Sequence, residues 1–238
     1  MTDDVSYQGF GAKALPFLKA LGFHQTREWF HANKDIFEIE LNEPRGRLVD
    51  DLAVRLKAED IPLTCSRRTS TFRINRDVRF AKEKHPYNTH VSAVVTRSGG
   101  KQDQGLLYIH MSPGDCYLAT GFYAMDPDEH RAFREAIVGR WDAYRESLAP
   151  LHALGYRMDN ESSLKRTPRG FEAVTDTDQL VHLRRRHLTL AKPLGEDRLA
   201  GTVLLDDLVA LAHASLPFLS FGWRAIDPVR AAREEASR

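Results

Sequence analysis

The stretch Phe72-Arg73-Ile74-Asn75-Arg76-Asp77-Val78-Arg79-Phe80-Ala81-Lys82-Glu83-Lys84-His85-Pro86-Tyr87-Asn88 decides how the rest of the chain is interpreted. Its first half predicts a strand, because strand side chains alternate between two faces. One face of this strand is apolar except for a central arginine: Phe72, Ile74, Arg76, Val78 and Phe80. The opposite face is polar: Arg73, Asn75, Asp77 and Arg79. The pattern therefore places one guanidinium among core residues.

A guanidinium in that position needs a partner, because an unpaired buried charge is costly. One interpretation is a structural salt bridge between Arg76 and a carboxylate of another element, with Glu40 as a candidate. The other interpretation is a binding site in which Arg76 meets a bound anion. A bulge near Arg76 and Asp77 would bring that carboxylate to the same face. The sequence leaves these interpretations open.

A basic loop follows the predicted strand. Pro86 lacks a backbone donor and disfavours a helical His85, so the strand ends before this point. From Arg67 to Lys84 the chain has seven Lys or Arg residues against two acidic residues, Asp77 and Glu83. This local excess of positive charge indicates an anionic ligand or partner.

The whole chain sets broad limits. Its 238 residues suit one α+β domain over 1–238, or a domain with a smaller C-terminal lobe from about residue 151. Hydrophobic residues make up 42%, enough for a core, and the net charge of +1 gives no overall attraction to nucleic acid or membrane. Neither the scattered histidines nor any other pattern indicates a metal or a cofactor. Two cysteines, an acidic N-terminus and no long apolar run predict a cytoplasmic protein without a membrane span.

Helical patterns flank a central group of strands. Helices are expected over 13–21, from a cap at Thr26 to about residue 41, through Leu48, Leu52 and Leu56, and from a cap at Asp126 to Pro150 with a bend at Gly139. Later helices are expected after Asp176 and after residue 195, the last ending at Pro217 before a fraying tail over 229–238. Strands are expected near 72–80, 90–97, 105–111, 116–123 and 187–191, with Gly121 as a bulge or close-approach point. Helices, then strands in series, then helices predict an α+β fold around an antiparallel sheet.

Several of these segments resemble a bacterial family of uncharacterised proteins, domain-of-unknown-function family 2461. The resemblance rests on Trp29-Phe30 with Asn33-Lys34, on Arg76-Asp77-Val78-Arg79-Phe80 with Lys84-His85-Pro86-Tyr87, and on Tyr108-Ile109-His110, Gly121-Phe122-Tyr123 and 164–170. It covers about residues 10–220. It departs from the family at His24-Gln25-Thr26, where the family often has paired asparagines. The resemblance implies a one-domain α+β protein and no particular activity.

The sequence lacks a phosphate-binding loop, a dinucleotide-binding glycine motif and a nucleophile elbow, so it assigns no enzyme class. We expect a basic pocket for an anionic small molecule that bears a phosphate or a carboxylate. The expected ligand-binding residues are Arg76, Asp77, Arg79, Lys84, Tyr87 and Tyr108. His110 is the candidate acid–base group, because histidine titrates near neutral pH.

A different class of function competes with this hypothesis. The basic segments 67–85, 165–169 and 184–186 are also typical of a non-catalytic module that binds a protein partner or nucleic acid. The two hypotheses differ in where the charges point. Arg76, Arg79, Lys84 and His110 converge on one pocket in the first hypothesis and spread over an open face in the second.

Overall fold

The structure is a computed structural model that describes residues 6–79, 83–158 and 163–236. It has an α+β fold with a five-stranded antiparallel sheet in the strand order β1-β2-β3-β5-β4, which confirms the predicted fold class. The chain divides into two compact units, each made of several segments. Unit 1 contains residues 1–103, 107–118 and 193–212, and unit 2 contains residues 104–106, 119–192 and 213–238. The prediction of a lobe from about residue 151 stays a prediction.

Unit 1 begins with a run of helices. They are α1 (Ala14–Phe23), α2 (Arg27–Ala32), α3 (Lys34–Phe37), a π-helical turn (Glu38–Asn42) and α4 (Glu43–Ala58). Thr26 caps α2 as predicted, since its hydroxyl accepts from the Trp29 N–H at 3.2 Å. The helix expected up to residue 41 is instead interrupted at Asn33 and continues through the π turn into α4. The predicted stripe of α4 is confirmed, because Leu48, Leu52 and Leu56 are all buried.

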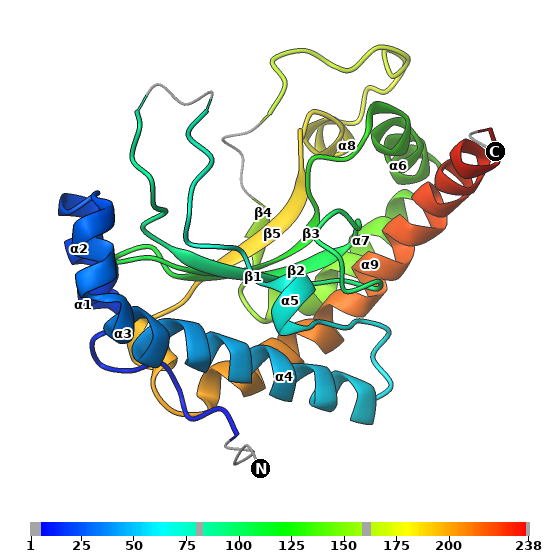
Figure 1. Ribbon diagram of the computed structural model, residues 1–238. Coiled ribbons are helices and arrows are strands. Elements are labelled where there is room, and N and C mark those ends of the chain that lie inside the picture. Colours follow the sequence, from blue (N-terminus) through cyan, green and yellow to red (C-terminus); the bar gives the residue numbers. More distant parts are fainter. Residues whose placement is uncertain (1–5, 80–82, 159–162, 237–238) are drawn as a thin grey trace. The chain divides into compact units, whose positions relative to one another are not determined.

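The strand expected near 72–80 is wrong. Residues 72–79 and 83–88, named here the arm, pair only through the isolated bridge Asn75–Tyr87 and neighbouring backbone hydrogen bonds, and Figure 1 shows them projecting beside α1 and α2. Ile74 is buried, but Arg76 is exposed rather than inward. The arm buries Ile74 and Tyr87, but its two segments are linked by an isolated bridge, so the side chains do not alternate as they would in a strand of a sheet. The expected position of Phe80 lies outside the described residues.

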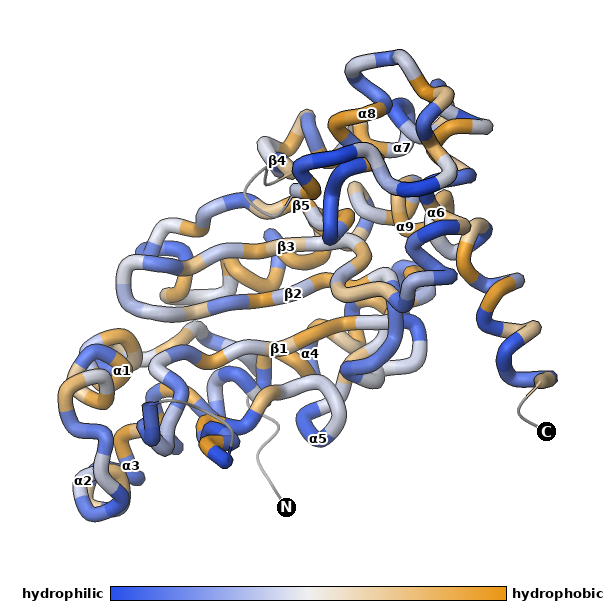
Figure 2. The backbone as a smooth tube through the Cα atoms, turned by 90° about the horizontal axis from the view of Figure 1, so that it is seen from above, coloured by the Kyte–Doolittle hydropathy of each residue, from blue (hydrophilic) through white to orange (hydrophobic). Residues whose placement is uncertain are grey.

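The predicted strands after the arm are present with shifted ends: β1 (Val91–Val95), β2 (Leu106–Met111) and β3 (Tyr117–Phe122). The short helix α5 (Arg67–Ser70) precedes the arm. β1 pairs antiparallel with β2, with Val91 opposite Met111 and Val95 opposite Leu107. All of β1 is buried, whereas burial along β2 alternates, and Figure 2 shows both hydrophobic and hydrophilic positions along β2. Tyr108 and His110 therefore occupy the more open face of β2.

Unit 2 contains α6 (Pro127–Gly139), α7 (Trp141–Ala153), β4 (Arg157–Met158), α8 (Thr177–Leu183) and most of β5 (Leu188–Pro193). The predicted cap of α6 is confirmed as a capping box formed by Asp126 and Glu129. Asp176 caps α8 as predicted. The bend expected at Gly139 is a break, since α6 ends there and α7 begins at Trp141.

The last helix differs most from its prediction. A 3-10 turn (Glu196–Leu199) precedes α9 (Val203–Ala236), which contains Pro217 instead of ending there and continues through the tail expected to fray. The two residues after the proline, Phe218 and Leu219, are fully buried, so packing outweighs the lost backbone hydrogen bond. By length and composition alone α9 is able to cross a membrane, but 56% of its most apolar window is buried inside the protein, which is typical of a core helix.

Candidate functional site

The predicted site residues do not meet at one point. Arg79 pairs with Asp77, with Nη2 2.7 Å from Oδ2, and the Arg79 side chain is 78% exposed. Lys84 Nζ donates to the carbonyl oxygen of Val78 at 2.9 Å. Arg76 is exposed, and Glu40, its proposed partner, instead accepts from the backbone N–H of Lys13 at 3.0 Å. The expected burial of Arg76 is therefore wrong, because residues 72–79 do not form the predicted strand and Arg76 does not share the burial of Ile74.

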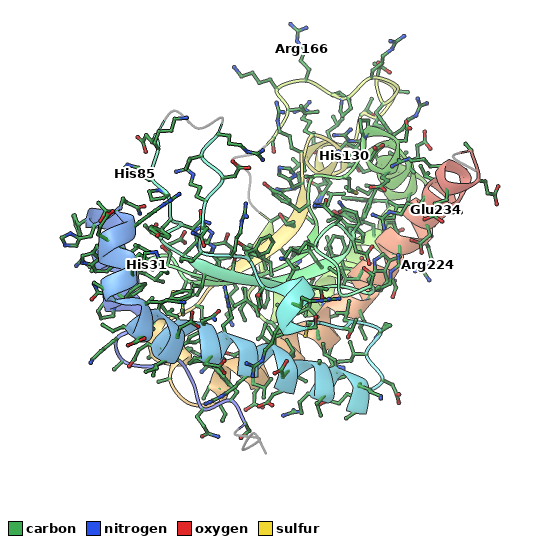
Figure 3. The ribbon with its side chains drawn as sticks, viewed as in Figure 1. His31, His85, His130, Arg166, Arg224 and Glu234 are labelled. Carbon is green, nitrogen blue, oxygen red and sulfur yellow. The ribbon has the colours of Figure 1, made fainter. Side chains whose placement is uncertain are left out.

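Arg76 and Tyr87 do share a pocket of about 330 Å³, named here the Arg76 pocket. It is lined by Gly22, Gln25, Arg76, His85, Tyr87, Asn88, Thr89 and His90. Tyr87 is buried at its base, stacked on Phe30 at 4.3 Å, and its N–H donates to Gln25 Oε1 at 3.1 Å. His85, labelled in Figure 3, belongs to the arm. The pocket brings one arginine and two histidines together.

His90 connects this pocket to the predicted acid–base candidate. Its ring lies 4.6 Å from the ring of His110, whose Nδ1 is 3.3 Å from the hydroxyl of Tyr108. Nε2 of His110 is 3.9 Å from Asp115 Oδ2, and the ring stacks on Tyr117 at 4.7 Å. Burial lowers the pKa of both histidines. A positive charge on His90 would lower the pKa of His110 further, and the carboxylate of Asp115 has a smaller, opposing effect on both. Both imidazoles are thus held in the neutral, proton-accepting form near neutral pH.

The larger concavity lies on another part of unit 1 and centres on a residue that the sequence patterns did not single out. Its volume is about 550 Å³, and it is named here the Arg45 groove. It is lined by Phe37, Asn42, Arg45, Arg68, Thr71, Phe72, Arg73, Ile74, Asn75 and Lys101. A smaller hollow of about 370 Å³ shares Asn42, Arg45, Arg68 and Thr71 with it. The groove lining contains four cationic side chains and no carboxylate.

Arg45 is placed at the floor of this groove by the start of α4. The π turn brings Asn42 under it, so that Arg45 Nη2 donates to Asn42 Oδ1 at 2.6 Å. Nη1 donates to the carbonyl oxygen of Phe72 in the arm at 2.7 Å. π-helical turns recur at functional sites, where they redirect side chains. Here the turn and the arm hold the guanidinium through two neutral acceptors.

Arg45 remains a charge without a counter-charge. It is 7% exposed, and its buried Nε has no hydrogen-bond partner among the residues that the structure describes. Within the same described residues, no carboxylate comes within 4 Å of the guanidinium, and Glu38 reaches it only through the side-chain amide of Asn42. Burial lowers the pKa of Arg45 to about 10, partly offset by Glu38, so the side chain stays protonated at neutral pH. A buried, cationic group with an unused donor is suited to an incoming anion.

The other cations of the groove differ from their neighbour Arg67. Arg67 pairs with both Asp50 and Glu43 and closes over Gly46, where any Cβ would collide with its guanidinium. Arg68, Arg73 and Lys101 have no carboxylate within 4 Å in the described ranges of the chain, and Lys101 Nζ lies 5.1 Å from the Phe72 ring centroid. Arg67 therefore has a structural role. The charges of Arg68, Arg73 and Lys101 are not neutralised by a neighbouring carboxylate among the described residues and could interact with an anion in the groove.

A signal for Arg45 was present in the sequence. The stripe of α4 runs backwards from Leu56 through Leu52 to Leu48, and Arg45 stands three residues before Leu48 on the same helical face. Extending that stripe by one turn predicts a buried arginine. The argument that a buried guanidinium needs an anion holds for this residue instead of Arg76.

No metal centre is formed by these side chains, since residues 6–79, 83–158 and 163–236 contain no group of three His, Cys, Asp or Glu residues arranged to hold a metal ion. The fold and the groove define an α+β protein with an exposed cationic cavity. Residues 13–221 match the family model of conserved hypothetical proteins known as DUF2461, and the chain belongs to that family. No curated protein and no solved structure matches the chain.

Proposed function

We propose that this protein binds an anionic small molecule, bearing a phosphate or a carboxylate, in the Arg45 groove. The observation that carries the proposal is the buried guanidinium of Arg45, which has an unused donor at Nε and no carboxylate within 4 Å among the described residues. A planar guanidinium presents paired donors that match carboxylate and phosphate oxygens. Arg68, Arg73 and Lys101 add charge at the groove wall.

The apolar side of the groove limits the ligand further. Phe37, Phe72 and Ile74 line the same cavity as the four cations. Ligand pockets of this kind combine an apolar wall with a few polar groups that fix the orientation. The proposed ligand therefore has an acidic head beside Arg45 and an organic body against Phe72, rather than being an inorganic ion alone.

The acid–base part of the proposal concerns His110. The Phe72 ring packs edge-on against Tyr108 at 6.3 Å, and the Tyr108 hydroxyl is 3.3 Å from His110 Nδ1. A lowered pKa keeps His110 neutral and able to accept a proton. We propose His110 as the acid–base group for a reaction on the bound ligand, with Tyr108 between it and the groove.

The proposed location is the cytoplasm of a bacterial cell. Cys65 and Cys116 are both free and buried, which fits a reducing compartment.

Thermal unfolding with and without phosphate, sulfate, sugar phosphates and carboxylic acids tests the binding proposal. A ligand at about 100 times its Kd stabilises the native state by about 2.7 kcal/mol. Replacing Arg68 or Arg73 by Ala removes a charged hydrogen bond of about 1.5–3 kcal/mol, so we expect affinity to fall about 10-fold to 150-fold. Lys57→Ala is the matched control, since Lys57 is exposed at the other end of α4 and carries the same charge.

Two outcomes oppose the proposal. Stabilisation by these anions that is equal in wild type, Arg68→Ala and Arg73→Ala would show that the groove does not bind them. Stabilisation that disappears in Arg76→Ala but persists in Arg73→Ala would move the site to the Arg76 pocket, where the sequence placed it.

A further inference from the structure

We propose that unit 2 binds single-stranded nucleic acid on a second surface, built around the stacked rings of Tyr123 and His187. Their centroids are 4.2 Å apart with an interplanar angle of 24°. Tyr123 is 57% exposed, although one side of its ring packs on His187, so the ring offers contact area to a further flat group. Aromatic rings exposed beside positive charge are the platforms on which unpaired bases stack.

The Tyr123 platform is held in place by its backbone. Gln104 Nε2 donates to the Tyr123 carbonyl oxygen at 2.8 Å, and the next N–H, that of Ala124, donates to His187 Nδ1 at 3.0 Å. Ala124 adopts a φ of 48°, a left-handed conformation that is costly for a residue with a Cβ. Such strain persists where the surrounding contacts fix it and is frequent at binding sites. The exposed tyrosine is thus positioned by three separate contacts.

His187 is suited to this role because it is an uncharged ring. Burial lowers its pKa, and the nearby charge of Arg186 lowers it further. Because Nδ1 accepts from Ala124, the proton of the neutral imidazole sits on Nε2. A neutral His187 gives Tyr123 a stable stacking partner near neutral pH.

Arg134 places a positive charge on the segment that leads to His187. Arg134 of α6 donates from Nε to the Leu183 carbonyl oxygen at 2.8 Å and from Nη2 to the Arg185 carbonyl oxygen at 3.2 Å. Both acceptors are neutral, so the charge of Arg134 is retained. His130 has a pKa lowered to about 4, by burial first and then by the charge of Arg134. Arg134 thus adds a positive charge to this part of unit 2.

The basic loop predicted from the sequence lies against the same segment. The Leu164 N–H donates to the Arg184 carbonyl oxygen at 2.7 Å, and Arg184 Nη2 lies 3.5 Å from Thr167 Oγ1. Lys165, Arg166, Arg169 and Arg186 are all exposed, and Figure 3 shows Arg166 projecting outward from this loop. Within residues 163–187 the sequence has six Lys or Arg residues against three carboxylates.

This combination favours single strands over other partners. Phosphates neutralise the basic side chains, and an unpaired base stacks on Tyr123. In a duplex the base faces are covered by their neighbours, so Tyr123 would contribute nothing. Arg184 and Arg186 have no carboxylate within 4 Å in the parts of the chain that the structure describes, and the buried Nε of Arg184 lacks a partner there.

Fluorescence anisotropy with the 238-residue chain and short labelled oligonucleotides tests this inference. We expect single strands to bind more tightly than duplexes, with an affinity that falls as salt rises. Tyr123→Ala should weaken single-strand binding about 5-fold to 150-fold, whereas Tyr123→Phe, which keeps the ring, should change it less than about twofold. Arg186→Ala should make the dependence of log K on log salt shallower by about 0.7, the effect of one phosphate contact. Lys57→Ala is the control for a lost surface charge, and thermal unfolding checks that each variant is folded.

Three results would overturn the inference: no binding at low salt, equal binding of duplex and single strand in wild type, or equal affinity of wild type and folded Tyr123→Ala. Loss of oligonucleotide binding in Arg73→Ala with full binding in Tyr123→Ala would also overturn it, because the strand would then occupy the Arg45 groove. The inference and the anion proposal fail separately. Stabilisation by a small anion is expected to survive Tyr123→Ala, and oligonucleotide binding is expected to survive Arg73→Ala.

Discussion

Arg45 donates a 2.7 Å hydrogen bond to the carbonyl oxygen of Phe72, which joins the first turn of α4 to the base of the arm. The two residues are 27 positions apart, and the arm carries Arg73 at the next position. The same bond therefore has two effects. It fixes the guanidinium of Arg45, and it brings the aromatic ring of Phe72 and the charge of Arg73 to the edge of one groove.

Arg45→Met tests the structural half of this relationship. The substitution leaves the Phe72 carbonyl and the Asn42 side-chain oxygen without their donor, at a cost of about 1–3 kcal/mol in the free energy of unfolding. Urea denaturation in low-salt buffer measures it. Arg47→Met is the matched control, since Arg47 stands on the same turn and its ion pair with Glu43, at 3.9 Å, is partly exposed, so a change within about 0.5 kcal/mol is expected. An Arg45→Met protein as stable as wild type would show that the bond contributes nothing.

His182 makes stability depend on pH. Its Nδ1 accepts from the buried Tyr144 hydroxyl at 2.9 Å, and burial lowers its pKa from 6.5 to about 4, with Arg185 and His152 lowering it further and Asp178 opposing them. As the pH falls from 6.5 towards 4, His182 becomes protonated in the unfolded chain but stays neutral in the folded protein. The unfolded state then binds more protons, so stability decreases over this window.

We expect His182→Gln to flatten that decrease. Denaturation curves for wild type and variant at a series of pH values give the difference directly, because the carboxylates and His130 titrate in both proteins. Parallel pH profiles would contradict the lowered pKa.

The elements predicted correctly depend on local signals. Thr26, Asp126 and Asp176 cap helices through contacts within two or three residues of their own position, and the stripe of α4 repeats at four-residue spacing from Leu48 to Leu56. Such patterns need no knowledge of the rest of the fold. The family assignment also followed from short segments of sequence.

The failures depend on distant partners. Alternation along residues 72–80 cannot show which of these positions another element covers; Ile74 is buried, whereas Arg76 is exposed. Pro217 stays inside α9 because of the packing of its neighbours, which no local rule contains. The contact between His90 and His110 depends on the pairing of β1 with β2, and Arg45 is held by a hydrogen bond to Phe72, 27 positions further along the chain.

The ion pair of Glu129 and Arg230 predicts an asymmetric response to mutation. Arg230 Nε is 2.8 Å from Glu129 Oε1, and the side chains are 25% and 5% exposed. Arg230→Met leaves a carboxylate buried without its cation, so we expect a loss of about 3 kcal/mol. Glu129→Gln removes the buried charge itself and should cost less. Arg131→Met is the control, because Arg131 and its partner Glu135 are mostly exposed and such pairs contribute little. Equal losses in Arg230→Met and Arg131→Met, measured by denaturation, would rule out this account.

Alanine substitutions at Gly121 and Gly114 allow the cost of a steric clash to be distinguished from the cost of backbone strain. Both have positive φ, 129° and 75°. A Cβ at Gly121 would meet the carbonyl oxygen of Leu188 more closely than real Cβ atoms approach, which agrees with the predicted close-approach point, whereas a Cβ at Gly114 would meet nothing within 4 Å. Gly114→Ala should therefore cost only the left-handed conformation, about 1–2 kcal/mol. Gly121→Ala adds displacement of the β5 backbone, so we expect a loss of about 3 kcal/mol or more. If both variants lost the same free energy of unfolding, the close approach of Leu188 to Gly121 would have no energetic consequence. The β5 backbone would then have to move enough to accommodate a methyl group while keeping its strand pairing.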